Sequence, residues 1–235
     1  MIITAILALV TTTLFTSCEK IKGKGEVITE TRTTGNYSGI SLAMSASVYF
    51  TPGDSYSLQI RGQENVLKQI VTQAEGTHLS IKVRNGVTLG SHEAITLYIT
   101  APVVTDLNVS GSGDIFVDKP WNTSNLSANI SGSGTISLND LTAGQISAII
   151  SGSGSIRATS GKVTREDLTI SGSGTIDLRS VECQTVYTTT SGSGDTYVHA
   201  TNMLDVTISG SGDIWYYGTP VINTHISGSG NLKRM

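Results

Sequence analysis

Residues 168–178 read Leu-Thr-Ile-Ser-Gly-Ser-Gly-Thr-Ile-Asp-Leu, and they set the pattern for most of the chain. The phrase Ser-Gly-Ser-Gly at their centre occurs seven times, at intervals of 21, 20, 20, 20, 18 and 18 residues. A repeat of this length is typical of a solenoid, in which each repeat forms one coil stacked on the coil before it. The copies begin at Ser110, Ser131, Ser151, Ser171, Ser191, Ser209 and Ser227.

Apolar and polar residues alternate on both sides of the phrase, as in Leu168, Ile170, Ile176 and Leu178. Strict alternation is the mark of a β-strand with one buried face. Counting on by twos places both glycines of each copy on the inward track and both serines outside. Glycine inside a strand marks a bend or the close approach of another backbone. The repeat glycines are Gly111, Gly113, Gly132, Gly134, Gly152, Gly154, Gly172, Gly174, Gly192, Gly194, Gly210, Gly212, Gly228 and Gly230.

These features predict an all-β fold, a single right-handed parallel β-helix with about 18–21 residues per coil. The right hand follows because crossovers between parallel strands are right-handed almost without exception. A helix is excluded because the apolar period is two and each interior glycine would cost a helix about 1 kcal/mol. A flexible linker is excluded because β-branched residues flank the copies.

The low charge of the chain argues against one class of partner, nucleic acid. The chain has 235 residues, 14% of them charged, and a formal net charge of −3. This balance argues against nucleic acid, which requires a basic patch. Serine, threonine, asparagine and glycine dominate the expected exterior, so the surface is polar with few charges.

The first residues predict a targeting signal. Residues 1–17 are apolar and too short for a membrane-spanning helix, which is typical of a signal peptide. The run Leu-Phe-Thr-Ser before Cys18 resembles a bacterial lipobox, although Phe15 stands where leucine is usual and no basic residue precedes the run. We therefore expect lipidation at Cys18 and a membrane tether, and the alternative is an ordinary signal peptide with an incidental cysteine.

The rest divides into three segments. Residues 18–34 are expected to form a tether and a first edge strand, residues 35–104 irregular entry coils, and residues 105–235 the seven-copy repeat. Within the entry coils, residues 63–70 predict a short helix, and Asn85-Gly86 predicts a tight hairpin.

Several motifs outside the repeat resemble the auto-transporter adhesin head (GIN) domain family, which comprises envelope proteins typical of Bacteroidetes-like bacteria. They are residues 36–40 (Asn-Tyr-Ser-Gly-Ile), residues 52–54 (Pro-Gly-Asp), Ala101-Pro102, and the serial Ile-Ser-Gly-Ser-Gly-x-Ile. The resemblance covers residues 28–235. It implies a right-handed parallel β-helix, a surface or periplasmic location and an adhesive role, and it supplies no catalytic motif.

The residue after each phrase forms an expected column that includes Asp195, Asp213 and Asn231 in consecutive coils. Stacked carboxylates suit Ca²⁺ or the hydrolysis of a polysaccharide. The alternative is that these short side chains hydrogen-bond nearby backbone, and we favour it because a calcium site needs more oxygen ligands.

Aromatic residues on the outward track are the other candidate site. Phe116, Tyr197, Trp215 and Tyr217 fall there, and Tyr187 is also outward by parity. Aromatic side chains beside serine and aspartate suit a glycan-binding or protein-binding face. The alternative is that they pack beneath neighbouring loops.

No catalytic or cofactor motif is evident. The four histidines have no metal-binding spacing, and the repeat lacks the Gly-x-Ser-x-Gly elbow and the phosphate loop. Cys183 aligns with Ala143 and is expected to fill the core. We therefore predict no metal, no cofactor and no enzymatic activity.

Three hypotheses follow. The first is a lipid-anchored outer-membrane protein that binds a glycan or protein along the flank of the β-helix. The second is a polysaccharide-active enzyme that uses the aspartate column. The third is a structural spacer that forms homo-oligomers through an open C-terminal edge, unless Lys233 and Arg234 discourage pairing there.

Overall fold

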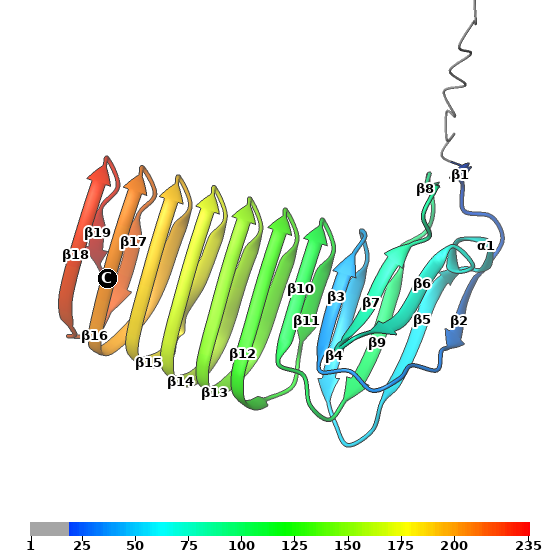
Figure 1. The fold of residues 1–235 in the computed structure, drawn as a ribbon, viewed down its shortest axis with the longest axis horizontal. Coiled ribbons are helices and arrows are strands. Elements are labelled where there is room, and N and C mark those ends of the chain that lie inside the picture. Colours follow the sequence, from blue (N-terminus) through cyan, green and yellow to red (C-terminus); the bar gives the residue numbers. More distant parts are fainter. Residues whose placement is uncertain (1–18) are drawn as a thin grey trace, which may run out of the picture.

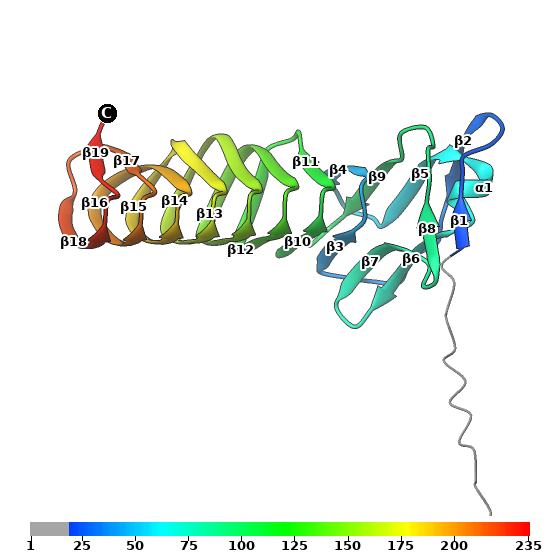
Figure 2. The same cartoon turned by 90° about the horizontal axis from the view of Figure 1, so that it is seen from above.

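The computed structural model describes residues 19–235, so the predictions of a signal peptide and of lipidation at Cys18 lie outside the described residues. The described chain is nearly all β-structure, and it forms a right-handed parallel β-helix. Successive coils lie side by side along the long axis, with the entry strands at one end (Figure 1, Figure 2). The predicted fold class is confirmed.

The repeat forms the stack of coils. Each coil pairs in parallel with the next, and the phrases lie in register, so that Gly132 is opposite Gly152 and Gly152 is opposite Gly172. Its strands are β10 (Asp106–Gly111), β11 (Asp114–Val117), β12 (Trp121–Gly132), β13 (Thr135–Gly152), β14 (Ser155–Gly172), β15 (Thr175–Gly192), β16 (Asp195–Gly210), β17 (Ile214–Tyr217), β18 (Val221–Gly228) and β19 (Leu232–Arg234).

The phrase is a sharp bend in every coil. The first glycine of each copy has a φ between 122° and 141°, which side chains rarely adopt. A Cβ on Gly172 would collide with the carbonyl oxygen of Gly152 in the coil before. The second glycine is buried in every copy, and a Cβ on Gly174 would lie 2.6 Å from Ile150 Cγ2. The first glycine is half-buried or exposed, so the prediction that both glycines face inward is wrong for the first, because the bend interrupts the alternation of the strand. All fourteen serines of the phrases are exposed.

Columns of aliphatic side chains fill the interior beside these glycines. Ile136, Ile156 and Ile176 stack directly and are fully buried. Cys183 stacks on Val163 and is 1% exposed, in agreement with its predicted place in the core. Burial raises the pKa of the Cys183 thiol, which keeps it in its unreactive protonated form.

The change from 20 to 18 residues per coil is absorbed at two corners. The pairing of β15 with β16 shifts register between Asp177 and Glu182 and again between Cys183 and Thr185. On either side of these shifts the strands remain in register, so the coil is two residues shorter at its corners and the phrases stay aligned.

The entry region, residues 19–104, is built differently. Strands β3 and β4 continue the stack by pairing in parallel with β10 and β11, whereas β2, β5 and β6 pair in antiparallel fashion. Its elements are β1 (Glu19–Ile21), β2 (Val27–Thr31), β3 (Gly39–Ala43), β4 (Ser47–Pro52), β5 (Ser57–Gln63), α1 (Glu64–Leu67), β6 (Ile70–Glu75), β7 (His78–Val83), β8 (Val87–Leu89) and β9 (Thr96–Ala101).

Two local predictions for this region can be compared with the structure. The short helix is present as α1, with Val66 and Leu67 fully buried. Asn85-Gly86 does form a turn, in which Val87 N donates to Arg84 O at 3.2 Å, but β8 pairs in parallel with β1 instead of with β7. The expected hairpin is therefore wrong, because the strand after the turn finds its partner in the first residues of the described chain.

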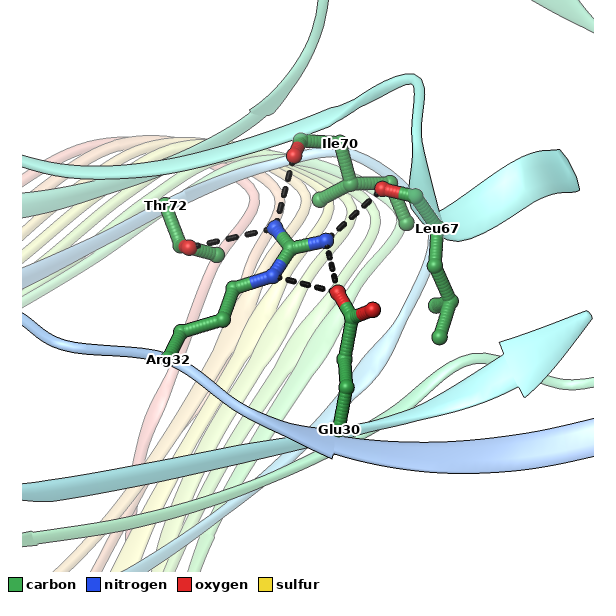
Figure 3. Close-up of polar contacts among 5 residues, drawn as sticks. All are labelled: Glu30, Arg32, Leu67, Ile70 and Thr72. Atoms are coloured by element: carbon green, nitrogen blue, oxygen red, sulfur yellow. Dashed lines mark hydrogen bonds and ion pairs between the residues drawn. The ribbon is translucent and has the colours of Figure 1, made fainter. Parts of the chain in front are cut away.

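Arg32 holds the outer layer of the entry region together (Figure 3). Its guanidinium donates to the carbonyl oxygens of Leu67 and Ile70, each at 2.7 Å, and to Thr72 Oγ1 at 3.1 Å. It also pairs with Glu30 on β2. One side chain therefore satisfies the last carbonyl group of α1 and the first of β6, which no repeat could supply.

Candidate functional site

One column of outward side chains crosses nearly the whole length of the β-helix. Its members are direct partners in successive parallel strands, so they project from the same flank. With about 4.8 Å between strands, the eight steps of the column span roughly 38 Å. We call it the flank column, and in order it contains Tyr98, Tyr49, Phe116, Ser137, Arg157, Asp177, Tyr197, Trp215 and Lys233.

The flank column begins with three stacked rings. The ring centroids of Tyr98 and Tyr49 are 5.6 Å apart with 19° between planes, and those of Tyr49 and Phe116 are 5.2 Å apart with 25°. Tyr98 remains 47% exposed. Parallel strands hold these rings at the strand spacing, which is close to the preferred separation of stacked aromatics.

The other end of the column alternates cations and rings. The guanidinium of Arg179 lies 4.1 Å from the centroid of Tyr197, and the ammonium of Lys233 lies 4.6 Å from that of Trp215. The two rings are nearly parallel, 6.2 Å apart. Carboxylates hold both cations in place: Arg179 Nε donates to Asp177 at 2.7 Å and Lys233 Nζ to Asp213 at 2.5 Å.

This packing controls what the rings can offer a ligand. Tyr49 is covered on both faces by other rings, while Tyr197 and Trp215 each have a ring on one face and a cation on the other. These three rings therefore offer a ligand mainly their edges, whereas Tyr98 and Phe116, at the ends of their stack, each have a ring on one face only. The predicted residues Phe116, Tyr197 and Trp215 do share one flank, where Phe116 stacks on Tyr49 and Tyr197 stacks on Trp215.

The aspartate column adjoins the flank column: Asp195 lies at the start of β16, and Asp213 and Asn231 directly precede β17 and β19. Both aspartates accept hydrogen bonds from the next coil. Asp195 Oδ1 accepts from the backbone N–H of Asp213 at 2.9 Å, and Asp213 Oδ1 accepts from that of Asn231 at 2.9 Å. The hydrogen bond from Lys233, followed by that from Asn231, lowers the pKa of Asp213. Among residues 19–235 no three His, Cys, Asp or Glu side chains are grouped as metal ligands.

Two predicted aromatic residues lie away from the flank column. Tyr217 is 38% exposed and lies beside His199, with ring centroids 6.1 Å apart. Tyr187 stacks between Asp167 and Asp205 in a different column, and Arg165 lies 4.1 Å from its ring centroid. Parity alone identifies an outward residue, but a coil has several outward faces.

Tyr49, Tyr98 and Arg179 were not predicted as site residues, and Lys233 was expected to guard an edge instead of covering a ring. Alternation in residues 47–50 does mark Tyr49 as outward, yet the entry region lacks the phrase that would align it with Phe116. Arg179 and Lys233 reach the rings of adjacent coils, and only the register of the strands brings them together.

The family model described as "Putative auto-transporter adhesin, head GIN domain" matches residues 36–220. The chain belongs to this family. No curated protein matches it. Within residues 19–235 no helix has the length and apolar character to cross a membrane.

Solved structures agree with this assignment. A "putative adhesin" from Bacteroides fragilis is 23% identical with a TM-score of 0.85, and it covers 92% of this chain and 100% of its own. A "putative lipid binding protein" from Parabacteroides distasonis is 26% identical with a TM-score of 0.77 and the same coverage. A "putative adhesin" from Parabacteroides merdae is 20% identical with a TM-score of 0.76, covering 92% and 99%. The family and these names indicate an adhesin-type protein of the cell envelope.

Proposed function

We propose that this protein is a non-catalytic adhesin that holds a protein ligand along the flank column. The observation that carries the proposal is the alignment of nine side chains from nine strands, eight of them aromatic or charged, into one surface. A rigid sheet keeps these side chains in place before the ligand arrives, which lowers the entropic cost of binding.

The composition of the flank column favours a protein over a glycan. Tyrosine, tryptophan and arginine are the residues that contribute most to protein–protein binding. Sugars stack on open ring faces, and three of the five rings of the column, those of Tyr49, Tyr197 and Trp215, have both faces covered. Ring edges and phenol groups can contact the side chains of a protein ligand. Arg157 and Asp177, which lie between the two aromatic clusters, can form hydrogen bonds with its side chains and backbone.

Adhesion by purified fragment tests this proposal. Beads coated with residues 19–235 should adhere to cells, and protease treatment of the cells should abolish adhesion while glycosidase treatment should not. Tyr98→Ala and Trp215→Ala should each weaken adhesion about tenfold, the loss expected for one interfacial aromatic. Tyr187→Ala removes an aromatic from another face and is the matched control. Equal loss in all three variants would contradict the assignment of the flank.

The membrane anchor is a separate proposal. A lipid on Cys18 would precede β1 directly, and β1 lies at the entry end of the molecule, so the stack would project away from the membrane (Figure 1). Cys18→Ala should release the protein from the outer-membrane fraction. A variant that stays membrane-bound after a high-salt wash contradicts lipidation.

Self-association is a second candidate function, favoured by the state of β18. Every residue of β18 is exposed, including Val221 at 71% and Ile226 at 41%, and no strand within residues 19–235 pairs with its outer edge. Lys233, expected as a guard residue, is engaged with Asp213. Ile226→Lys should abolish any concentration-dependent dimer seen in sedimentation, because a charge on an edge strand opposes pairing.

The enzyme hypothesis is less well supported than either. Both oxygens of Asp213 and one oxygen of Asp195 accept hydrogen bonds within the protein, and such bonds favour the ionised form over the protonated form that a general acid requires. Turnover of any member of a polysaccharide panel, lost in Asp213→Asn, would restore that hypothesis.

A further inference from the structure

Three adjoining hollows lie at the first coil of the stack, on a face that does not carry the flank column. Their volumes are about 460, 270 and 460 Å³. The first and second share Thr105 and Asn125, and the second and third share residues 122–124, so the three are neighbours along β12, and we call them together the groove. Volumes of roughly 300–1,000 Å³ are typical of sites for small ligands.

The groove exists because the stack begins unevenly. Residues 121–125 of β12 pair with residues 141–145 of β13 on one side, and no strand within residues 19–235 pairs with them on the other. Residues 102–105, which lead into β10, line the second hollow together with them. The backbone groups of residues 121–125 that point away from β13 therefore border the groove, and no strand within residues 19–235 pairs with them.

The side chains that line the groove are mainly amides and hydroxyls. Asn122 and Asn125 have no side-chain hydrogen bond within residues 19–235, and both are exposed. Gln145 donates one hydrogen bond to Asp167 at 2.8 Å, which leaves its carbonyl oxygen free to accept. Val103, which is 59% exposed, adds an apolar wall.

We propose that this groove binds a neutral oligosaccharide. A sugar presents hydroxyls that both donate and accept, and the amides and hydroxyls of the groove do the same. The apolar face of a sugar ring would rest on Val103. No Lys or Arg side chain lines the three hollows, so an anionic ligand would have no partner charge.

An extended peptide fits the groove less well than a sugar. A peptide would add to the free edge of β12 as a further strand. That edge is short, and Thr105 closes it at one end because Ser127 N already donates to Thr105 O at 2.8 Å. The proposal does not depend on the flank column, which uses other residues.

Nuclear magnetic resonance titration of residues 19–235 locates the site without any substitution. The probes are cellohexaose, mannohexaose and maltohexaose as neutral ligands, hexagalacturonate as an anionic one, and a hexapeptide of Val and Thr. At least one neutral probe should shift the side-chain amide signals of Asn122, Asn125 and Gln145. Shifts caused by the peptide or by hexagalacturonate alone would overturn the proposal, as would no shift with any neutral probe.

Variants then separate this groove from the flank column. The double variant Asn125→Ala, Gln145→Ala should weaken binding of the neutral probe at least tenfold, as expected for the loss of one or two hydrogen bonds. Asn223→Ala, which removes an exposed amide from β18, and Tyr98→Ala should leave it unchanged. Unaltered binding in the double variant, or binding lost only in Tyr98→Ala, would overturn the assignment whatever the adhesion assay shows.

Discussion

The stack and the entry region contribute strands to the same parallel sheet, but different interactions stabilise the two regions. In the stack, residues 105–235, one phrase is repeated, and each glycine packs on the glycine of the coil before it. In the entry region, residues 19–104, antiparallel strands, α1 and the Arg32 network replace repetition. Stability in the stack therefore depends on many equivalent contacts, and in the entry region on a few irreplaceable ones.

The comparison also explains where ligands are expected to bind. Repetition aligns outward residues into a column, which is how the flank column forms. The junction between the two regions leaves β12 without a neighbour on one side, which is how the groove forms. The flank column therefore depends on the regularity of the coils, and the groove depends on the irregular junction between the two regions.

The largest effect should come from a glycine of the stack. Gly172→Ala adds a Cβ against the carbonyl oxygen of Gly152 at a φ of 130°, so we expect a loss of roughly 3–5 kcal/mol in unfolding free energy. Gly35→Ala in the entry region is the control, because its Cβ would meet Ala74 at an ordinary 3.4 Å. Urea unfolding measures both, and similar losses would show that the stacked glycines are not special.

Arg32 should be the most sensitive polar residue of the entry region. Arg32→Met strands the carbonyl oxygens of Leu67 and Ile70, so we expect a loss of about 2–3 kcal/mol. Arg61→Met, at an exposed position on β5, should change the unfolding free energy by less than about 0.5 kcal/mol. Hydrogen exchange should show faster opening of α1 and β6, with the stack unaffected. Uniformly faster exchange would mean that the two regions unfold as one unit.

A buried acid in the stack should make stability depend on pH. Glu166 lies fully buried between Ile146 and Val186, without a hydrogen-bond partner in the described chain, and burial raises its pKa well above the usual value. Below the unfolded pKa of about 4.3, Glu166 is neutral in both the folded and the unfolded protein, and its burial costs least. As the pH rises from there towards the folded pKa, the unfolded state loses the proton first, and the unfolding free energy of the protein falls.

Glu166→Gln should therefore stabilise the protein by about 1–2 kcal/mol at pH 8, with a difference that vanishes near pH 4. Thermal melts at both pH values test this. The control is Glu182→Gln, which alters an exposed carboxylate. A Glu166→Gln effect independent of pH would contradict the buried neutral acid.

The smallest effect concerns the exposed end of the flank column. The lowered pKa of Asp213 means that its contribution is present above pH 4 and lost as pH falls through the folded pKa. Because the ion pair with Lys233 is partly exposed to solvent, Asp213→Ala should cost only about 0.5–1 kcal/mol at pH 7. Added salt should reduce the difference, and a loss above 3 kcal/mol would place Asp213 in a structural role that its exposure does not suggest.

Sequence alone could predict the stack because its information is periodic. The Ile-Ser-Gly-Ser-Gly phrases fix strand, bend and coil length together, and they placed Phe116, Tyr197 and Trp215 outward. Only part of the flank column could be predicted from the sequence, because Tyr49 and Tyr98 lie where the repeat is absent. The groove was invisible, because it depends on where β12 lacks a neighbour, and no local pattern around Asn125 encodes that.

The distance between two labelled phrases tests the stacked register most directly. Spin labels on Ser133→Cys and Ser229→Cys, in a Cys183→Ala background, lie on exposed serines five coils apart. At about 4.8 Å per coil the attachment points should be roughly 24 Å apart, with one narrow distribution in double electron–electron resonance. A broad distribution, or a main distance beyond about 40 Å, would contradict the in-register stack and both binding surfaces built on it.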